Sequence, residues 1–360
     1  MKKFILIFCF IIGCLIVGCS DDEKGTNGDP VVPTEVPRVV ADTLAAAPST
    51  MDANDAVWAT IDSTIVQIGF TEDYGQNSQM VKDTLLMKVI LKSDMLYVWA
   101  RWNDPTPDIW GNYALKSTGT GFWQHIELAD YNGGEDAFMV IFDAGDNGAE
   151  GADCSAMCHA VANRMATTGG GHVDAWCWKS ARLAPAYLAE DNWWTGSGNF
   201  PDPAPIVNAQ QPFRENWVDR GASSTPEWMH PDDTAFHGTY LYYSDVVEFD
   251  ADPFVGWDSV PGYKMPGFAI DTTIYSNASR DDRWDVLAAS VYDSLSSPHT
   301  WTVVLARTLT SSGNNDVDLT TLDSIQVSVA AGNEHTFGED AGFRGHSGSV
   351  PFYIILPRAE

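Results

Sequence analysis

Short runs in which apolar residues alternate with other residues constrain the fold of this chain most. In the run from 96 to 102, Leu96, Val98, Ala100 and Trp102 fall on one face, and Tyr97, Trp99 and Arg101 fall on the other. A period of two predicts a β-strand with one face in a hydrophobic core. Clusters of Gly, Pro, Asn and Asp separate this run from further candidate strands, which are the run marked by Leu86, Val89 and Leu91, then Gln124–Leu128, Ala137–Phe142, Tyr240–Phe249, Val286–Val291, Trp301–Leu309, Ser324–Ala331 and Phe352–Leu356.

The fold class that these runs predict is all-β. Long helical periodicity is absent from the sequence, so we expect residues 51–360 to form an antiparallel β-sandwich. Between about residues 145 and 231 the alternation disappears, and Gly, Trp, Cys, His and Pro accumulate instead. We interpret this stretch as a long Trp/Gly-rich insertion that carries short helices, around Ala160–Ala166 and Lys179–Leu183. Insertions of such length usually serve a function.

The first residues have the pattern of a secretory signal. Lys2 and Lys3 precede the apolar run Phe4–Val17, which is too short to span a bilayer with flanking anchors, and the small residue Gly18 precedes Cys19. The segment 15–19, Leu-Ile-Val-Gly-Cys, resembles the bacterial lipobox, in which the cysteine is acylated and becomes the new N-terminus. We therefore predict a lipoprotein signal peptide at residues 1–18 and lipidation of Cys19; the alternative is a short buried helix that ends in cysteine.

Residues 19–50 are expected to be a flexible tether. They are mostly Asp, Gly, Thr, Pro, Val and Ala, without a sustained period. Ser20 after the cysteine favours transfer to the outer membrane, so we expect an exported protein anchored by lipid at its periplasmic or cell-surface side.

The charge balance excludes several partners. Lys and Arg number 20 against 49 Asp and Glu, which gives a formal net charge of −29. Nucleic acids and anionic membrane surfaces would repel such a chain, so we expect contact with the membrane through the lipid anchor only. The charge suits a basic partner protein, although an acidic exported surface needs no partner to explain it.

A pair of cysteines followed by a histidine is the strongest chemical signal. Residues 153–160 read Asp-Cys-Ser-Ala-Met-Cys-His-Ala, a Cys-x3-Cys-His spacing, whereas the usual haem c attachment signal is Cys-x2-Cys-His. Two thiols can add to the two vinyl groups of haem, and the adjacent imidazole can bind the iron. This predicts Cys154 and Cys158 as thioether donors and His159 as a ligand of the haem iron. The alternatives are a disulfide with one free thiol, or a structural zinc site of Cys154, Cys158, Cys177 and His172.

Segments around this motif carry a family resemblance. They are Trp-Gln-His-Ile-Glu at 123–127, Glu-Asp-Ala-Phe-Met-Val-Ile-Phe at 135–142 and His-Val-Asp-Ala-Trp-Cys-Trp-Lys-Ser-Ala-Arg at 172–182, with further segments at 97–105, 284–289, 301–307 and 315–317. The chain resembles the haem-binding domain family typified by the gamma subunit of ethylbenzene dehydrogenase and shared with dimethylsulfide dehydrogenase. The resemblance covers roughly Asp55 to Leu356.

The resemblance implies a β-sandwich that holds one haem and transfers electrons. In the gamma subunits the haem is of type b and is held by a Met and a Lys, which align here with Met157 and Lys264. With covalent attachment, His159 becomes the first iron ligand, and the second is Lys264, Met265, Met165 or His172. The chain departs from the gamma subunits in its lipid anchor, its cysteine pair and its long insertion.

Taken together, these patterns predict an exported, lipid-anchored haem protein that passes electrons to a redox partner protein and is not an enzyme. The c-type haem is the favoured cofactor and a b-type haem is the alternative. The rival hypothesis is a cell-surface carbohydrate-binding module without haem, because 14 tryptophans could stack on sugars and Trp176, Trp178, Trp193 and Trp194 crowd the insertion. The acidic stretch marked by Asp143, Asp146, Asn147, Glu150 and Asp153 lacks EF-hand spacing, so a solvated loop is expected there rather than a calcium site.

Overall fold

Two antiparallel sheets form the main body of the chain. The computed structural model describes residues 36–43, 45–48, 51–70, 84–111, 113–116, 123–125, 134–157, 165–202, 211–218, 225–231, 239–249, 264–271, 282–310, 315–333 and 345–357. The predicted signal peptide, Cys19, Cys158 and His159 lie outside these residues. Within the described part, no helix is long and apolar enough to cross a membrane.

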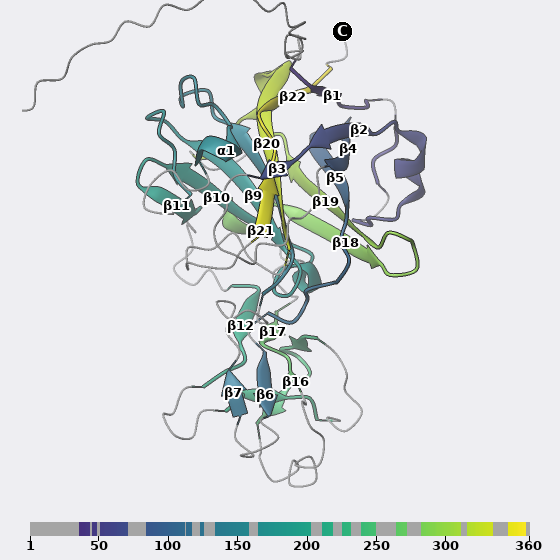
Figure 1. Cartoon of the computed structure of the whole chain (residues 1–360), viewed down its shortest axis with the longest axis vertical. Helices are drawn as coiled ribbons and strands as arrows, with labels where there is room; N and C mark the ends of the chain where they lie inside the picture. Colours follow the sequence, from purple (N-terminus) through teal and green to yellow (C-terminus); the bar gives the residue numbers. More distant parts are fainter. Residues whose placement is uncertain are drawn as a thin grey trace, which may run out of the picture. The chain divides into compact units, whose positions relative to one another are not determined.

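The larger sheet has nine strands and runs in the order β1-β22-β20-β8-β9-β10-β11 (Figure 1). In addition, β21 pairs with β20, and β3 pairs with β21. Its strands are β1 Arg38–Val40, β3 Gly69–Phe70, β8 Ala137–Asp143, β9 Val173–Lys179, β10 Glu190–Thr195, β11 Gly198–Pro201, β20 Ser324–Asn333, β21 Gly345–Gly348 and β22 Phe352–Ile355. All pairings in this sheet are antiparallel except that of β1 with β22.

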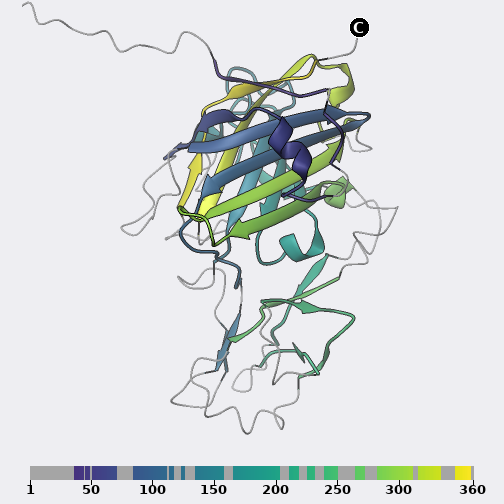
Figure 2. The same cartoon turned by 90° about the vertical axis from the view of Figure 1, so that its right-hand side faces the viewer.

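The second sheet has five strands in the order β18-β19-β5-β4-β2, and Figure 2 shows them side by side. They are β2 Thr64–Gln67, β4 Thr84–Lys92, β5 Met95–Asn103, β18 Leu287–Asp293 and β19 Thr300–Thr308. Every pairing here is antiparallel. The all-β class and the antiparallel sandwich predicted from the sequence are therefore confirmed.

The core lies between the two sheets and follows the alternation of the sequence. Leu96, Val98 and Ala100 of β5 are 0% exposed and pack in one cluster with Phe138 and Val140 of β8. Burial of a large apolar side chain contributes roughly 1.5–3 kcal/mol, so this shared cluster is a main source of stability. The opposite face of β5 carries Trp99, which stacks on Trp58 of the 3-10 helix η1 (Ala56–Thr60).

Three smaller sheets come from the remaining strands. Their strands are β12 Phe213–Glu215 with β17 Phe268–Ile270 and β14 Leu241–Tyr242, then β16 Lys264–Met265 with β6 Ala114–Lys116 and β7 Trp123–His125, and finally β13 Trp228–Met229 with β15 Val247–Glu248. The strand expected over Tyr240–Phe249 is thus only two short pieces, which pair with different sheets.

The stretch that was expected to be an insertion is partly built into the large sheet. The stretch 145–231 supplies three strands of the large sheet, β9, β10 and β11. In β9 the residues 173–178 are all buried, because both of its faces are covered, and a strand covered on both faces reads as a continuous apolar run without alternation. The helix expected at Lys179–Leu183 is instead the end of β9 and a turn, followed by the 3-10 helix η2 (Ala184–Ala186).

Two further expectations meet the structure only in part. The end of the predicted tether forms β1, which pairs with β22. Val39 of β1 is buried. A four-residue helix, α1 (Cys154–Met157), stands at the cysteine motif, whereas most of the helix expected over Ala160–Ala166 lies outside the described residues.

Candidate functional site

The face of the large sheet that points away from the sandwich core carries the candidate site. In this register Ala330 of β20 lies opposite Met139 of β8, Met139 lies opposite Cys177 of β9, and Cys177 lies opposite Glu190 of β10. Directly opposed residues of antiparallel strands point to the same side of a sheet. These residues therefore form a row across one face, which we call the outer face.

Sulfur-bearing side chains are concentrated on the outer face. A buried apolar cluster there contains Met139, Cys154, Met157, Met165 and Cys177. Its other members include the small side chains of Ala137, Ala175 and Ala330 on neighbouring strands. These three small side chains come from three paired strands, β20, β8 and β9, and the sulfur atoms of the cluster supply soft metal ligands.

Helix α1 brings two predicted site residues onto this face. The side chains of Cys154 and Met157 are both 0% exposed. The segment is tied to β20 by the backbone N–H of Ala152, which donates to Oε1 of Gln326 at 3.0 Å. Cys158 and His159 follow directly in sequence, so the motif begins at the outer face, although the structure does not describe these two residues.

Two loops lie beside α1, one with Asn147 and Glu150 and the other with Thr168 and Gly169. The side-chain amide of Asn147 donates to the sulfur of Met157 at 3.6 Å. Glu150 accepts hydrogen bonds from the backbone N–H groups of Thr168 and Gly169, at 2.7 and 2.9 Å. Burial opposes ionisation of Glu150, but the hydrogen bonds from Thr168, Gly169 and Asn147 outweigh it and lower its pKa.

His172 lies at the same pair of loops. Its Nδ1 is 2.7 Å from Oδ2 of Asp146, and its backbone N–H donates to Oδ1 of that carboxylate at 2.8 Å. Asp146 and Glu150 thus bind N–H and O–H donors of the protein. Among the described residues, Cys154, Cys177 and His172 do not form a group of potential metal ligands.

Cys177 is a buried thiol that forms no disulfide. Burial, with Glu190 and Glu135 nearby, raises its pKa to about 11, against the opposing effect of Lys179 and Arg182. The thiol is therefore protonated at neutral pH and a poor nucleophile.

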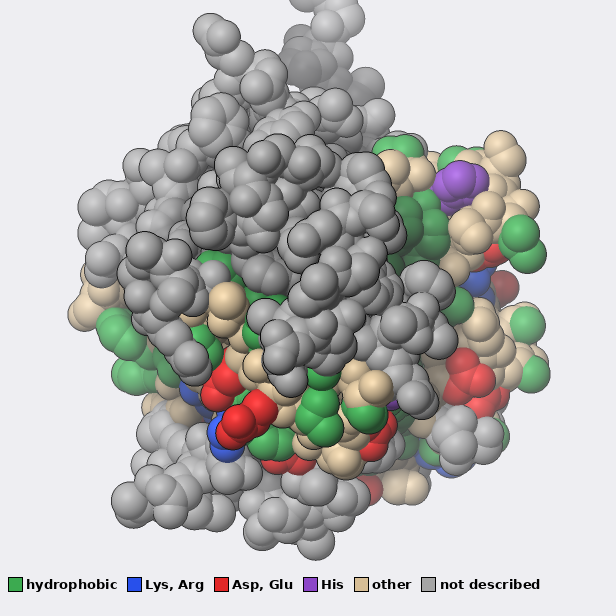
Figure 3. Space-filling model, turned by 90° about the horizontal axis from the view of Figure 1, so that it is seen from below, with side chains coloured by type: hydrophobic (Ala, Val, Ile, Leu, Met, Phe, Trp, Pro, Cys, Tyr) green, Lys and Arg blue, Asp and Glu red, His purple; other side chains and the backbone are tan. Residues whose placement is uncertain are grey.

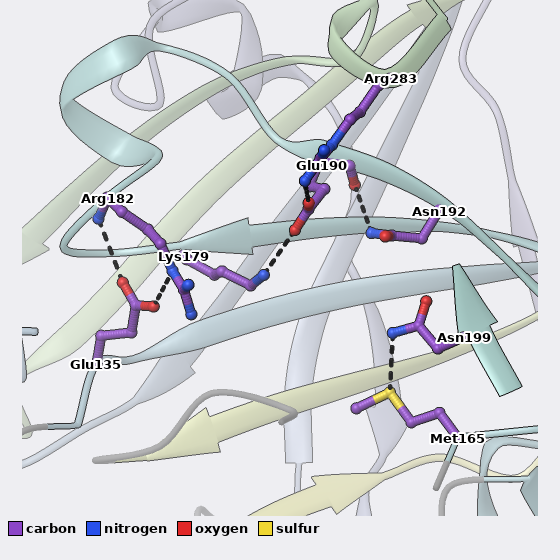
Figure 4. Close-up of polar contacts among 8 residues, drawn as sticks. All are labelled: Glu135, Met165, Lys179, Arg182, Glu190, Asn192, Asn199 and Arg283. Atoms are coloured by element: carbon purple, nitrogen blue, oxygen red, sulfur yellow. Dashed lines mark hydrogen bonds and ion pairs between the residues drawn. The ribbon is translucent and has the colours of Figure 1, made fainter. Parts of the chain in front are cut away.

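Two glutamates that act on the pKa of Cys177, Glu135 and Glu190, form the ion pairs drawn in Figure 4. Nζ of Lys179 is 2.7 Å from Oε2 of Glu190, and Arg283 contacts the other oxygen of this carboxylate. Burial opposes the ionisation of Glu190, but both cations outweigh it and lower its pKa to about 2. Nε of Arg182 is 2.6 Å from Oε1 of Glu135, a carboxylate that is fully buried.

Figure 4 also shows Met165 and its contact with Asn199. The side-chain amide of Asn199, on β11, donates to the sulfur of Met165 at 3.8 Å. Met165 belongs to the sulfur-rich cluster together with Met157. The two predicted ligands Lys264 and Met265 lie on β16, which pairs with β6 of a smaller sheet. Met265 is buried, and the side chain of Lys264 lies outside the described part of the chain.

Inside the sandwich lies a charged cluster that the sequence analysis missed. Nη1 of Arg307 is 3.0 Å from Asp174, 2.9 Å from Asp191 and 3.3 Å from Asp316. Burial lowers the pKa of Arg307, but these carboxylates and Asp285 outweigh it and raise the pKa. The three carboxylates are also the one group of potential metal ligands in the described part. Because the guanidinium already lies among them, we interpret the cluster as structural.

A charged residue inside an apolar strand was the signal for this cluster. Arg307 interrupts the run 301–309, and Asp174 stands next to Val173 in β9. Burial, Asp174 and other carboxylates raise the pKa of Asp191 well above its usual range, in spite of Arg307. Burial, with Asp316 and Asp174, raises the pKa of Asp285 to about 7, although Arg307 and a hydrogen bond with Asp191 oppose this.

The fold and the site define an all-β sandwich protein with a sulfur-rich outer face on its larger sheet. The chain matches the family described as ethylbenzene dehydrogenase over residues 55–337, and it belongs to this family. The resemblance seen in the sequence is therefore confirmed.

Two further comparisons add little. No curated protein matches the chain. Among solved structures, the chain is similar to a family 9 carbohydrate-binding module from Caldicellulosiruptor kristjanssonii in complex with glucose. That similarity covers 90% of this chain and 97% of the module, with 9% identity and a TM-score of 0.33. A similarity this weak supports no conclusion about fold or function.

Proposed function

We propose that this chain is an exported, lipid-anchored haem protein that transfers electrons, with one c-type haem attached through Cys154 and Cys158. In this proposal His159 is an iron ligand. The observation that carries the proposal is the position of α1, which holds Cys154 and Met157 buried on a sulfur-rich, apolar face in a chain of the ethylbenzene dehydrogenase family. A bound haem supplies the one-electron chemistry of its iron, and the protein supplies ligands, burial and orientation.

The residues of the outer face fit a haem. A porphyrin is flat and apolar, and the outer face carries a buried apolar cluster that includes the small side chains of Ala137, Ala175 and Ala330. Thiols and thioethers are the donors that attach haem or bind its iron. The hydrogen bonds from Asn147 to Met157 and from Asn199 to Met165 fix the positions of two candidate sulfur ligands.

The second iron ligand decides the reduction potential. Met157 and Met165 both lie in the outer-face cluster, and a methionine ligand raises the potential. A b-type haem held by Met157 and Lys264 is the alternative arrangement. In either arrangement the chain is a carrier of electrons and not an enzyme.

The burial of the tryptophans weighs against the carbohydrate-binding alternative. Of the twelve tryptophans whose burial the structure describes, eight are buried and four are partly buried. Trp176, Trp178 and Trp194 are among the tryptophans that could have stacked on sugars. All three are 0% exposed, so their rings cannot do so.

An acidic surface suits a basic redox partner. The whole chain has a formal net charge of −29. On the face drawn in Figure 3, acidic side chains are more prominent than basic ones among the coloured residues. Complementary charge would accelerate the encounter with a basic partner, and the rate would fall with rising salt concentration.

The proposal is tested by haem staining on a denaturing gel. The full-length chain is produced with its signal in a host that has the cytochrome c maturation machinery. We expect stain on the denatured wild-type chain, no stain on the Cys154→Ala/Cys158→Ala variant, and full stain on Cys177→Ala. The last variant is the matched control, because Cys177 lies in the same cluster but outside the motif.

The other outcomes discriminate between the alternatives. Haem that is visible in the native spectrum but lost on denaturation would replace the c-type arrangement with the b-type one. A colourless wild-type protein, produced with ample haem, would overturn the proposal and favour the carbohydrate-binding alternative.

A further inference from the structure

The outer face has two chemically different ends. At one end Asp143 of β8 lies opposite Val173 of β9, and the segment leading into α1 packs there against Gln326. At the other end Ala137 lies opposite Lys179. Six residues separate these rows along each strand, which at the usual rise corresponds to about 20 Å.

At the second end, the described ion pairs contain three basic and two acidic side chains. Lys179, Arg182 and Arg283 meet only Glu135 and Glu190 in the ion pairs that the structure describes, and these five side chains are 0–19% exposed. In addition, the Nε–H of Arg283 is buried and has no hydrogen-bond acceptor. Buried charges are normally paired, and buried donors are normally satisfied. The unused donor of Arg283, close to the ion-paired Lys179, is therefore suited to an anionic ligand.

The propionate groups of haem are anions that could bind at this end. Haem carries two vinyl groups along one edge and two propionate carboxylates toward the opposite edge. If the thiols of the motif hold the vinyl edge near α1, the propionates extend toward Lys179. The distance between the two ends of the face is long enough for a porphyrin with its propionates.

We propose that Lys179, Arg182 and Arg283 bind the propionate groups of the haem, so that the haem lies along the outer face with its propionates at the Glu190 end. This inference rests on the proposed function. Glu135 and Glu190 act as positioning residues, because each holds a cation in place. Glu135 is itself held by the backbone N–H groups of Ala181 and Arg182, at 3.0 and 3.2 Å.

The test compares binding of haem with binding of haem dimethyl ester, in which both propionates are esterified. The full chain with Cys154→Ala and Cys158→Ala is the parent, so that binding is reversible. Loss of both cations would leave Glu190 buried without a partner, so the test variant carries Lys179→Gln, Arg283→Gln and Glu190→Gln together.

The parent is expected to bind haem at least roughly tenfold more tightly than the ester, since charge-assisted hydrogen bonds are lost on esterification. The test variant is expected to lose most of this preference. Lys92→Gln is the matched control, because it removes a lysine from the other sheet, and it is expected to keep the preference. Lys179→Arg, which retains the cation, is also expected to keep it.

Three outcomes would overturn the inference. A test variant that keeps the full preference shows that these cations do not bind the propionates. A parent that binds haem and its ester equally shows that no cation binds them, while the proposed function stands. A parent and a wild-type chain that bind neither porphyrin overturn both proposals. If circular dichroism shows that the test variant is unfolded, Lys179→Gln alone decides, with a smaller loss of preference expected.

Discussion

The side-chain amide of Asn147 donates to the sulfur of Met157 at 3.6 Å and also to the backbone oxygen of Gly151 at 2.8 Å. Asn147 is 0% exposed, and its own backbone oxygen lies against Gly169, where an added Cβ would be 1.9 Å away. The position of Met157 on the outer face therefore depends on the close approach of two loops.

Replacement of Gly169 by alanine is expected to disturb this approach. A Cβ would collide with the backbone of Asn147, which cannot move as a flexible side chain can. We expect Gly169→Ala to lower the free energy of unfolding by about 1–3 kcal/mol and to reduce the haem content of the purified protein. Urea unfolding and haem absorbance measure the two effects. Gly196→Ala is the control, because its Cβ would lie 3.6 Å from Thr167; equal losses in both variants would contradict this account.

The buried cluster of Arg307 leads to a prediction on stability. Removal of its guanidinium leaves Asp174 and Asp191 in the core without their cation. We expect Arg307→Gln to lower the free energy of unfolding by about 3–5 kcal/mol at neutral pH. Arg38→Gln, at an exposed arginine of β1, is expected to change it by less than about 0.5 kcal/mol. A loss near 1 kcal/mol in Arg307→Gln would show that the cluster contributes little to stability.

Asp285 gives the stability a dependence on pH. Its pKa in the folded protein is about 7, above its ordinary value of 3.8, so the folded state binds this proton more tightly than the unfolded state. The contribution of Asp285 to stability therefore decreases as the pH rises from about 4 to about 7 and stays constant above that. The difference in unfolding free energy between Asp285→Asn and the wild type should grow in favour of the variant over this range. A difference that is the same at pH 4 and pH 8 would contradict the assignment.

Cys177 is expected to be unreactive in the folded protein. Its pKa of about 11 leaves almost no thiolate at pH 8, and its side chain is buried. Iodoacetamide should therefore modify Cys177 much more slowly in the native chain than in urea, as mass spectrometry of the peptide would show. Equal rates in the two conditions would show that the thiol is accessible and that the outer-face cluster is open.

The alternating strands could be predicted from the sequence, because each has one face in the core and one face outside it. Leu96, Val98, Ala100 and Trp102 occupy the core as expected. Strand β9 could not be predicted in this way, because Val173 and Cys177 are buried on the outer face while Trp176 and Trp178 are buried in the sandwich. A strand covered on both sides has no period of two in its hydrophobicity.

The candidate site could be predicted only where it is local in sequence. Cys154 and Met157 are close along the chain, so the motif indicated them, and both lie on the outer face. The pairs of Lys179 with Glu190 and of Glu135 with Arg182 join residues 11 and 47 positions apart. Such pairs depend on strand register, which a single sequence does not specify.

The central claim is that the chain carries electrons on one haem, and a spectroelectrochemical titration of the purified full-length protein tests it most directly. The visible spectrum is recorded while the applied potential is lowered and then raised again. This account predicts haem absorption bands that change reversibly, with a single one-electron midpoint potential and one haem per chain. A protein without such bands, or with bands that do not respond to the potential, would contradict it.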